Sequence, residues 1–321
     1  MLLGIEIGGT KLQFGVGRGD GPPLVELRRL SVQPKEGAEA IRRQIVRTAG
    51  PLIEQYGIQG IGIGFGGPVD SAAGRTIVSH QVEGWTDFPL AAWCRQTLGL
   101  PTLVANDSDS AGLAEARFGA GRGHSVVVYN NIGSGIGGAI VIDGKLFRGS
   151  GGVVAEIGHL RPGPQADRID QDLEAVASGW AITAAVRARL EDPQGHHPTD
   201  AQDLHSRCQG QLDRLDTRLI AEAAAAGNRL AQHVLDQACQ TIGWALAQVI
   251  TLLAPSVVVM GGGVSLAGEQ LFFAPLRRYV RQYVFPPLIG TYQIVPAQLG
   301  EEVVVYGALA LAAEMLGSTD D

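Results

Sequence analysis

The sequence predicts an α/β protein made of two similar halves, and three observations support this. Strand-like and helix-like segments alternate through most of its 321 residues. Each half begins with two apolar strand-like runs joined by a turn of glycines and one hydroxyl residue, "GGT" at 8–10 and "GSG" at 133–135. The chain is also too long for one typical hydrophobic core, whereas two domains of this size could each bury their own.

The elements of the first half follow from their patterns in order. Apolar runs predict strands at 2–7, 11–17, 24–32, 60–65 and 101–105. Helices are expected near 36–56, near 89–98 and from about residue 108. A hairpin therefore comes first, and an alternation of strands and helices follows it.

The second half repeats this order from Gly123 onward. The runs "HSVVVYNNI" and "AIVIDG" predict two strands, followed by helices near 169–190, 213–253, 267–284 and 303–316 and strands at 256–260 and 291–296. Residues 191–210 are interpreted as an exposed connection, in which His196 and His197 have no function. Residues 237–265 carry no charge, but Pro255 and Ser256 interrupt them, which favours a buried helix and strand over a membrane span.

Composition argues against several classes of partner. The net charge of −7 and the scattered Lys and Arg residues leave no basic stripe for nucleic acid. Cys94, Cys208 and Cys239 are far apart, which argues against a disulfide framework and a cysteine zinc site and fits a reducing compartment. Met1 runs directly into a strand-like segment without a leader pattern. We expect a cytoplasmic protein that binds neither nucleic acid nor a membrane.

The two glycine-hydroxyl turns indicate a phosphate site. Backbone N–H groups at such a turn form an anion-binding concavity, and Thr10 or Ser134 can add a hydroxyl donor. One such turn alone is typical of an ordinary hairpin, but two in matching positions predict a polyphosphate held between them. Gly133, Gly135 and Gly138 match G-x-G-x-x-G, yet a strand-like segment follows where a dinucleotide site needs a helix.

Polar residues at two further places could carry chemistry. Asn106 and Asp107 stand where a strand gives way to a helix, so either one could cap that helix, and a carboxylate there could also accept a proton. Glu156, His159 and Glu174 are either ordinary structural and surface residues or a group that grips a ring of hydroxyls. The run "VVVMGGGVS" is either a strand-to-helix turn or a backbone on which adenine and ribose can lie.

Taken together, these motifs resemble the ROK family of bacterial sugar kinases and related repressors, and its glucokinase branch in particular. The matching segments are "GIEIGGTK", "GFGGPVD", "VEGWTDFPL", "VANDSDSAGLAEARFGAG", "GSGIGGAIVIDGKLFRG", "AEIGH", "LEAVASG" and "VVVMGGGV". The resemblance implies a two-lobed actin-like ATPase (ribonuclease H-like) fold, in which each lobe is a mixed sheet with flanking helices. Residues 1–118 and a C-terminal helix at 301–321 would form the smaller lobe and 119–300 the larger, with a cleft between them.

The resemblance also implies roles. Asp107 would be the catalytic base. The sugar would contact Gly66, Gly67, Asn106, Glu156, His159 and Glu174. The nucleotide would contact Gly8, Gly9, Thr10, Lys11, Gly133, Ser134, Gly135, Gly261, Gly262 and Gly263.

The reaction expected from these roles uses ATP and Mg²⁺ to phosphorylate a hexose hydroxyl, specifically O6 of glucose, in a homodimer. Kinases for fructose, mannose or an N-acylated aminosugar are alternatives, and a non-catalytic sugar-binding regulator is an alternative of another class. Repressors of the family carry a helix-turn-helix ahead of this body, and we expect none here because the first strand starts at about residue 2.

The sequence departs from the family pattern in the stretch that usually binds zinc. The motif C-x-C-G-x-x-x-G-C is replaced by "LRPGPQADRIDQDL", which has no cysteine and places Asp172 at the position of the last one. We therefore expect no structural zinc. Ion pairs among Arg161, Asp167, Arg168 and Asp172 are expected to brace this loop instead.

Further departures lie beside the predicted site. Glu6 replaces an Asp near magnesium and is expected to reach the metal through water. Gly66, Gln81, Ala105 and Asp109 replace the family's Pro, Asn, Glu and Asn. These changes bear on the identity of the sugar more than on the reaction.

Overall fold

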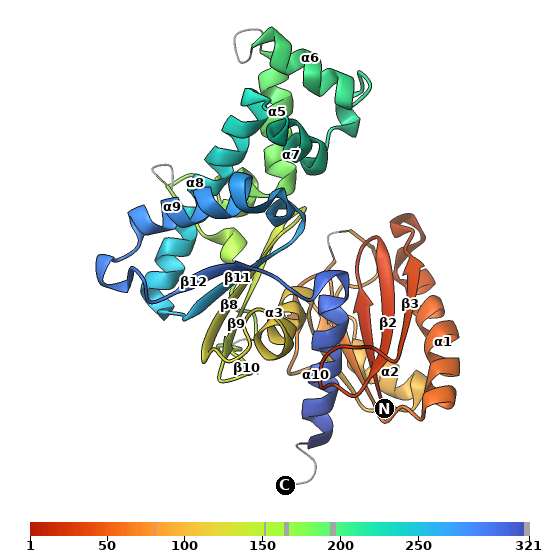
Figure 1. Ribbon diagram of the computed structural model, residues 1–321. Coiled ribbons are helices and arrows are strands. Elements are labelled where there is room, and N and C mark those ends of the chain that lie inside the picture. Colours follow the sequence, from red (N-terminus) through yellow and green to blue (C-terminus); the bar gives the residue numbers. More distant parts are fainter. Residues whose placement is uncertain (80, 151, 164–166, 193–196, 318–321) are drawn as a thin grey trace. The chain divides into compact units, whose positions relative to one another are not determined.

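Two five-stranded sheets with the same strand order organise the fold (Figure 1). The computed structural model describes residues 1–79, 81–150, 152–163, 167–192 and 197–317. The first sheet has the order β3-β2-β1-β4-β7 and the second the order β10-β9-β8-β11-β12. The repeated hairpin and alternation predicted from the sequence are confirmed.

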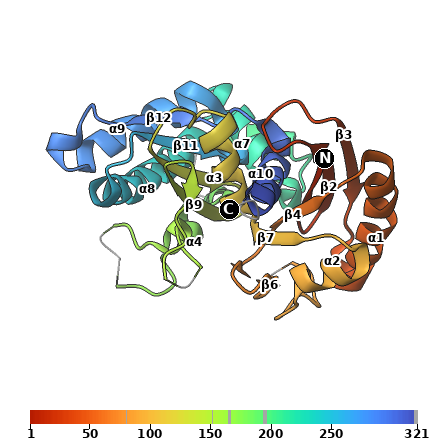
Figure 2. The same ribbon diagram turned by 90° about the horizontal axis from the view of Figure 1, so that it is seen from below.

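The first sheet contains β1 (Leu2–Ile7), β2 (Lys11–Gly17), β3 (Glu26–Ser31), β4 (Gly60–Phe65) and β7 (Thr102–Asn106). Strand β1 pairs antiparallel with β2 and parallel with β4, which in turn pairs parallel with β7. Helices α1 (Gly37–Tyr56) and α2 (Leu90–Leu98) cover one face, and α10 (Val303–Gly317) covers the other (Figure 2). Helix α3 (Asp107–Phe118) follows β7 directly.

Glycines on the α10 side of the first sheet let that helix lie directly against the strands. A Cβ atom on Gly62 would lie 1.8 Å from the carbonyl oxygen of Ala308, and one on Gly4 would lie 2.7 Å from that of Val305. Side chains alternate between the two faces of a strand, so the neighbouring residues Leu3 and Ile5 of β1 pack into the core on the opposite face. This close approach explains part of the unusually high glycine content.

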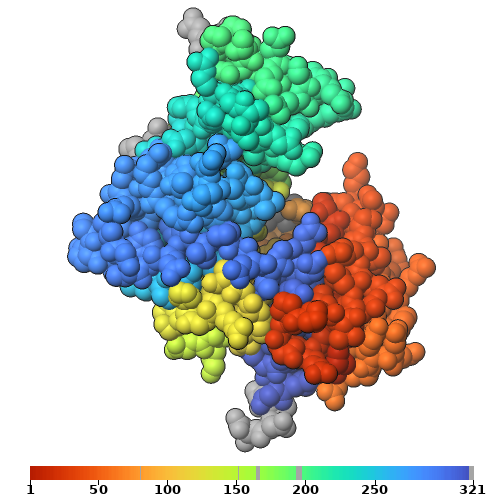
Figure 3. Space-filling model, viewed as in Figure 1, coloured from red at the N-terminus to blue at the C-terminus, as the bar shows by residue number. Residues whose placement is uncertain are grey.

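The second sheet contains β8 (Val126–Ile132), β9 (Ile136–Ile142), β10 (Lys145–Leu146), β11 (Val257–Gly261) and β12 (Gln293–Pro296). Its associated helices are α4 (Leu173–Ala177), α5 (Gly179–Glu191), α6 (Pro198–Arg207), α7 (Thr217–Ala225), α8 (Arg229–Leu253) and α9 (Ala274–Tyr283). Helices α5, α6 and α7 lie together at one end of their unit (Figure 1), and their residues form the green end of the space-filling view (Figure 3). A separate pair of short strands, β5 (Val69–Asp70) and β6 (Arg75–Thr76), was not predicted.

Contacts between residues group the chain into two compact units. The first contains Met1–Tyr129, Ala139–Ala155 and the chain from Ala297 onward, and the second contains Asn130–Gly138 and Glu156–Pro296. The lobe boundaries expected from the sequence, at 118/119 and 300/301, stay a prediction.

Two helices predicted as continuous are each divided, so these predictions were wrong. The helix expected at 169–190 is broken at Ser178, whose hydroxyl accepts a hydrogen bond from the Ala181 N–H and caps α5. The helix expected at 213–253 is broken at Gly227, which has a φ of 96°, and Asn228 then caps α8. Both breaks follow from residues that cap helices better than they continue them.

One further prediction for the second half needs correction and another is confirmed. Residues 191–210 are more than a connection, because α6 begins at Pro198 after His197, whose ring nitrogen caps the helix. His196 lies outside the described residues. The helix expected near 267–284 is confirmed: after a 3₁₀ turn at Gly263–Ala267, a π-helical turn at Glu269–Phe273 continues directly into α9, which ends at Tyr283.

The uncharged stretch 237–265 forms the buried part of α8 and the buried strand β11, as predicted. In the part of the chain that the structure describes, no helix combines the length and apolar character that crossing a membrane requires.

Candidate functional site

The turn between β1 and β2 brings the first group of predicted site residues together. The Gly8 N–H donates to the Lys11 carbonyl at 2.9 Å, which closes the turn. Lys11 Nζ lies 2.9 Å from Glu6 Oε1. The Gln81 side chain lies over Gly9, because a Cβ atom on that glycine would be only 1.5 Å from Gln81 Oε1. Gln81, one of the residues that depart from the family pattern, therefore covers the glycine turn, on which Thr10 is exposed.

Glu6 is a buried carboxylate with an uncommitted oxygen. Its exposed fraction is 5%, and among the described residues neither Glu6 Oε2 nor the Oε1 of Gln13, its partner across the β1–β2 ladder, has a hydrogen-bond partner. Burial raises the pKa of Glu6, and the charge of Asp107 raises it further, while Lys11 opposes both effects. Carboxylate and amide oxygens are ligands that suit Mg²⁺ and its bound waters, so this pair fits a hydrated magnesium ion.

Asn106 and Asp107 divide the roles that the sequence left open. Asn106 caps α3, since its Oδ1 accepts from Ser108 N at 2.8 Å, and its Nδ2 donates to the Gly67 carbonyl at 2.9 Å. Asp107 is the first residue of the helix, and its Oδ1 also accepts from Ser108 N at 2.7 Å. A Cβ atom on Gly66 would lie 3.6 Å from Asp107 Oδ2, so this oxygen points toward the glycine turn after β4.

The environment of Asp107 favours proton acceptance. Its side chain is half-buried, and burial raises the pKa of the carboxyl. The hydrogen bonds from Ser108 and the charge of Lys11 partly offset this effect. Within the described residues, the carboxylate has one oxygen fixed by the helix and the other without a hydrogen bond.

The turn between β8 and β9 is held from behind by two helices. The Gly133 N–H donates to the Gly135 carbonyl at 2.9 Å, and the N–H groups of Gly179 and Trp180 at the start of α5 donate to the carbonyls of Gly133 and Ser134 at 2.8 Å and 3.4 Å. From α4, Glu174 Oε2 accepts a hydrogen bond from Ile136 N at 2.6 Å. A sugar-contacting role for Glu174 would therefore use its other carboxylate oxygen.

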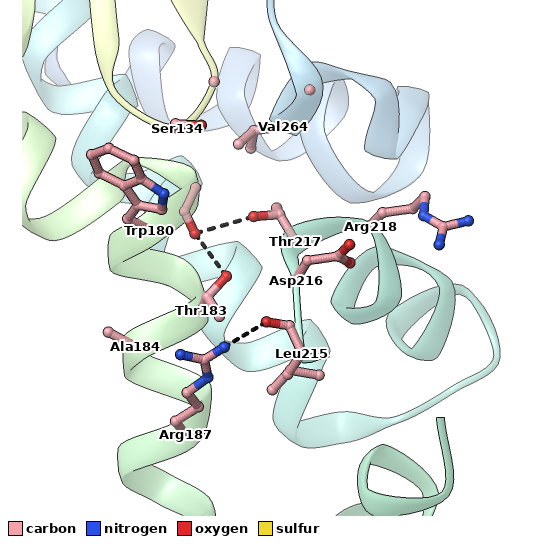
Figure 4. A pocket seen from close by; sticks show the side chains of 13 residues that line it. Ser134, Trp180, Thr183, Ala184, Arg187, Leu215, Asp216, Thr217, Arg218 and Val264 are labelled. Atoms are coloured by element: carbon pink, nitrogen blue, oxygen red, sulfur yellow. Dashed lines mark hydrogen bonds between the residues drawn. The ribbon is translucent and has the colours of Figure 1, made fainter. Parts of the chain in front are cut away.

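A cavity of about 770 Å³ opens beside this turn (Figure 4). Its walls are the turn at 133–134, one face of α5, the segment 215–218 and residues 263–264. The ring of Trp180, which is 64% exposed, stands at the cavity near Ser134 (Figure 4). Arg187 reaches across from α5 and donates to the carbonyls of Leu215 and Asp213 at 2.9 Å and 3.1 Å. The sequence did not predict Trp180, Arg187 and the 215–218 segment as site residues, because no local pattern shows which face of a helix will line a cavity.

Of the three consecutive glycines Gly261–Gly263, Gly262 has the strictest backbone requirement. Its φ is 87°, and a Cβ atom there would lie 2.4 Å from the Ile132 carbonyl at the end of β8. The Ser265 hydroxyl donates to the Gly262 carbonyl at 2.7 Å. Gly261 ends β11, and a Cβ atom on Gly263, which lines the cavity, would have no neighbour within 4 Å.

The segment from Glu156 to Glu174 holds the remaining predicted sugar contacts. Glu156 is exposed and precedes a 3₁₀ turn at Ile157–His159. His159 Nδ1 lies 3.0 Å from Asp172 Oδ2, and Asp172 Oδ1 accepts from Ala175 N at 2.9 Å, which caps α4. Ala155, where the family pattern has glycine, has a φ of 60°.

The ion pairs predicted among Arg161, Asp167, Arg168 and Asp172 are absent from the described residues. Arg161 instead donates to the carbonyls of His159 and Ile169 at 3.3 Å and 3.1 Å. Arg168 pairs with Asp170 at 2.5 Å. The loop is thus held by backbone carbonyls and by the His159–Asp172 pair.

The predicted site residues fall into two sets. Glu6, Gly8, Gly9, Thr10, Lys11, Gly66, Gly67, Asn106 and Asp107 belong to the first unit, and Gly133, Ser134, Gly135, Glu156, His159, Glu174, Gly261, Gly262 and Gly263 to the second. That the two sets face a common cleft stays a prediction. Within the described residues, no three His, Cys, Asp or Glu side chains cluster closely enough to hold a metal ion by themselves.

The chain is similar to known proteins over nearly its whole length. The model of the ROK family matches residues 2–315. The glucokinase of Thermotoga maritima is 32% identical over 98% of both chains. Two solved structures are similar over nearly their full length. The ROK glucokinase of Streptomyces griseus in complex with glucose and AMPPNP has a TM-score of 0.80 and 32% identity, covering 98% of this chain and 99% of that one. The ROK hexokinase of Thermus thermophilus has a TM-score of 0.79 and 28% identity, covering 100% of this chain and 99% of that one.

The two-sheet α/β architecture agrees with those two solved ROK structures, whose fold is that of the actin-like ATPases. The match extends over nearly all of the sequence and includes both glycine turns and the Asn106–Asp107 pair. The chain belongs to the ROK family and has the actin-like ATPase fold.

Proposed function

We propose that the chain is an ATP-dependent sugar kinase that phosphorylates O6 of glucose. Family membership supports a sugar kinase, and the similarity to a glucokinase that binds glucose and an ATP analogue supports the choice of substrates. The observation that carries the proposal is the position of Asp107 at the start of α3, with one oxygen fixed and the other directed toward Gly66.

Asp107 would act as the general base. Asp107 Oδ2 takes the proton of the sugar hydroxyl while the hydroxyl oxygen of the sugar forms a bond to the γ-phosphorus. The bond between this phosphorus and the oxygen that bridges it to the β-phosphate breaks, which releases ADP. Because burial raises its pKa, the carboxyl is a stronger proton acceptor than an exposed aspartate. The remaining catalysis in phosphoryl transfer is positioning and charge neutralisation.

The nucleotide would be held by backbone more than by side chains. The turns at Gly8–Lys11 and Gly133–Gly135 would hold the phosphates, and Gly261–Gly263 and the cavity beside Trp180 would take the nucleoside. The volume of this cavity, about 770 Å³, lies within the usual range of a ligand pocket. A magnesium ion on the phosphates would neutralise their charge, and Glu6 and Gln13 are the residues suited to hold its waters.

The sugar would contact Asn106, Glu156, His159 and Glu174, with the turn at Gly66 and Gly67 closing one side. Asn106 keeps one amide hydrogen beyond the bond to Gly67, and Glu174 keeps one oxygen beyond the bond to Ile136. Both can therefore contribute to a hydroxyl network without giving up their structural bonds.

The proposal is tested by measuring turnover of glucose, fructose, mannose and N-acylated aminosugars with ATP and magnesium in a coupled assay. We expect the highest kcat/KM for glucose and, in a ³¹P NMR spectrum of the product, phosphate on O6. A preference for another sugar would keep the kinase and overturn the glucose assignment. Sugar binding without turnover of any sugar would identify a non-catalytic regulator instead.

A further inference from the structure

Asp172 contacts two elements with its two carboxylate oxygens. Oδ1 accepts from the Ala175 N–H at 2.9 Å and caps α4, while Oδ2 lies 3.0 Å from His159 Nδ1. Only 18% of the Asp172 side chain is exposed, whereas that of His159 is 66% exposed. The aspartate is therefore the fixed partner, and the imidazole extends from it toward solvent.

This contact determines which ring nitrogen carries the proton. A carboxylate only accepts hydrogen bonds, so His159 Nδ1 must be the donor. In the neutral imidazole, Nε2 then has no hydrogen and is an acceptor. We propose that Asp172 is a positioning residue that holds His159 in the Nδ1–H tautomer, so that Nε2 accepts a hydrogen bond from a sugar hydroxyl. The inference rests on the proposed function, since it deepens the role of His159 in sugar binding.

Asp172 also joins this imidazole to the second glycine turn. Leu173 N donates to the Leu160 carbonyl at 2.8 Å, and the next residue, Glu174, accepts from Ile136 N at 2.6 Å. His159 is thus connected to β9 through its contact with Asp172, the backbone at the start of α4, and the hydrogen bond between Glu174 and Ile136. His159 Nε2 and Glu174 both present acceptors, which favours a ligand that offers hydroxyl donors to both.

Two substitutions of Asp172 separate its contacts. Asp172→Ser keeps a good helix cap but is too short to reach the imidazole. Asp172→Asn has a single oxygen; when this caps α4, the amide nitrogen faces His159 and donates to Nδ1, which reverses the tautomer. Asp170→Ser is the matched control, because Asp170 lies in the same loop and pairs with exposed Arg168 instead.

Kinetics test the positioning role. We expect Asp172→Ser to raise the KM for the sugar about 10-fold, the lower end of the effect of losing an orienting partner, with kcat and the KM for ATP within about 2-fold of wild type. Asp170→Ser should match wild type. In a His159→Ala background, adding Asp172→Ser should change the sugar KM by less than about 2-fold, since its effect passes through the imidazole. An equal increase in both backgrounds, or none in either, would overturn the proposal.

Nuclear magnetic resonance tests the tautomer without any turnover. Long-range ¹H–¹⁵N spectra of the full chain at a pH where the ring is neutral should show Nδ1–H for His159 in wild type and Nε2–H in Asp172→Asn. The signal is assigned by its loss in His159→Ala, among the 7 histidines. An Nε2–H tautomer in wild type would overturn the inference even if glucose is phosphorylated. Failure to phosphorylate any sugar, with Nδ1–H observed, would instead count against the proposed function alone.

Discussion

Asn106 fastens the cap of α3 to the glycine turn after β4, because its Nδ2 donates to the Gly67 carbonyl at 2.9 Å while its Oδ1 accepts from Ser108 N at 2.8 Å. The residue beside the proposed base thus adds a side-chain bond between the start of α3 and the turn after β4, which the pairing of β4 with β7 already brings side by side. Both polar atoms of the Asn106 side chain therefore take part in structural hydrogen bonds. From the sequence, Asn106 was predicted only as a helix cap or a sugar contact.

Replacing Asn106 should separate stability from positioning. Asn106→Ala removes both bonds and should lower the free energy of unfolding by about 1–3 kcal/mol, combining a lost cap with a lost hydrogen bond. Asn106→Asp keeps the cap but cannot donate to Gly67, so it should cost less stability and still reduce kcat. Thermal unfolding and steady-state kinetics check both variants. Equal stability losses in the two would contradict a separate role for the Gly67 bond.

Of the two glycines after β11, Gly262 should not tolerate substitution by alanine, whereas Gly263 should. Gly262→Ala forces alanine to a φ of 87° against the Ile132 carbonyl, which should cost at least about 1–3 kcal/mol and raise the KM for ATP. Gly263→Ala meets no atom within 4 Å and is the matched control for stability. Denaturant unfolding of both variants measures the difference, and a Gly262→Ala protein as stable as wild type would contradict the described backbone.

Replacing Glu6 by glutamine should raise the stability of the protein and weaken its use of magnesium. Glu6→Gln replaces the uncommitted Oε2 by an amide group that can donate to the unpartnered Gln13 Oε1 on the adjacent strand. We expect stability at neutral pH to rise by about 1 kcal/mol and the magnesium concentration needed for half-maximal activity to increase. Unfolding and magnesium titrations test the two halves of this prediction separately.

The sign of the pH dependence of stability follows from the raised pKa of Glu6. The native state binds this proton more tightly than the unfolded state, so stability falls as pH rises from the unfolded pKa through the higher native one. Glu6→Gln should remove that part of the slope, which unfolding curves across this range would detect. An unchanged slope would mean that Glu6 is not buried as a charged group.

Lys11 should shift the acid limb of the activity profile. Its charge lowers the pKa of both Asp107 and Glu6. Without this charge the pKa of Asp107 rises, so the base stays protonated up to a higher pH. Lys11→Met should therefore move the acid limb of the kcat–pH profile to higher pH. Lys35→Met removes a lysine outside the site and serves as the control. A limb that stays in place in Lys11→Met would contradict the assignment of that limb to Asp107.

The local sequence predicted the helices, strands and turns that position the site. It predicted the side-chain contacts within the site less well. The glycine turns and strands followed from alternation, and Asn106 from its position before a helix. The breaks at Ser178 and at Gly227 were missed, although Ser178 and Asn228 are helix-capping residues, because the apolar pattern continues across both places. The His159–Asp172 pair joins positions separated by a loop, so only the folded chain brings it together.

The cavity beside the second turn shows the same limit. Trp180 and Arg187 lie on a helix whose sequence does not distinguish the face that lines the cavity from the face that packs. That distinction depends on where the 215–218 segment lies, which is set by packing between elements. The glycines could therefore be predicted, because their backbone requirement is local, whereas the side chains around them could not.

The central claim is that Asp107 removes the proton from the sugar hydroxyl. Its most direct test is kcat for Asp107→Asn alongside calorimetric binding of glucose, with Asp109→Asn, which restores the family's residue on the same helix, as the control. The account predicts a fall in kcat of about 10²–10⁴-fold, binding of glucose within a few-fold of wild type, and an active control. An Asp107→Asn protein that keeps more than about a tenth of wild-type kcat would contradict it.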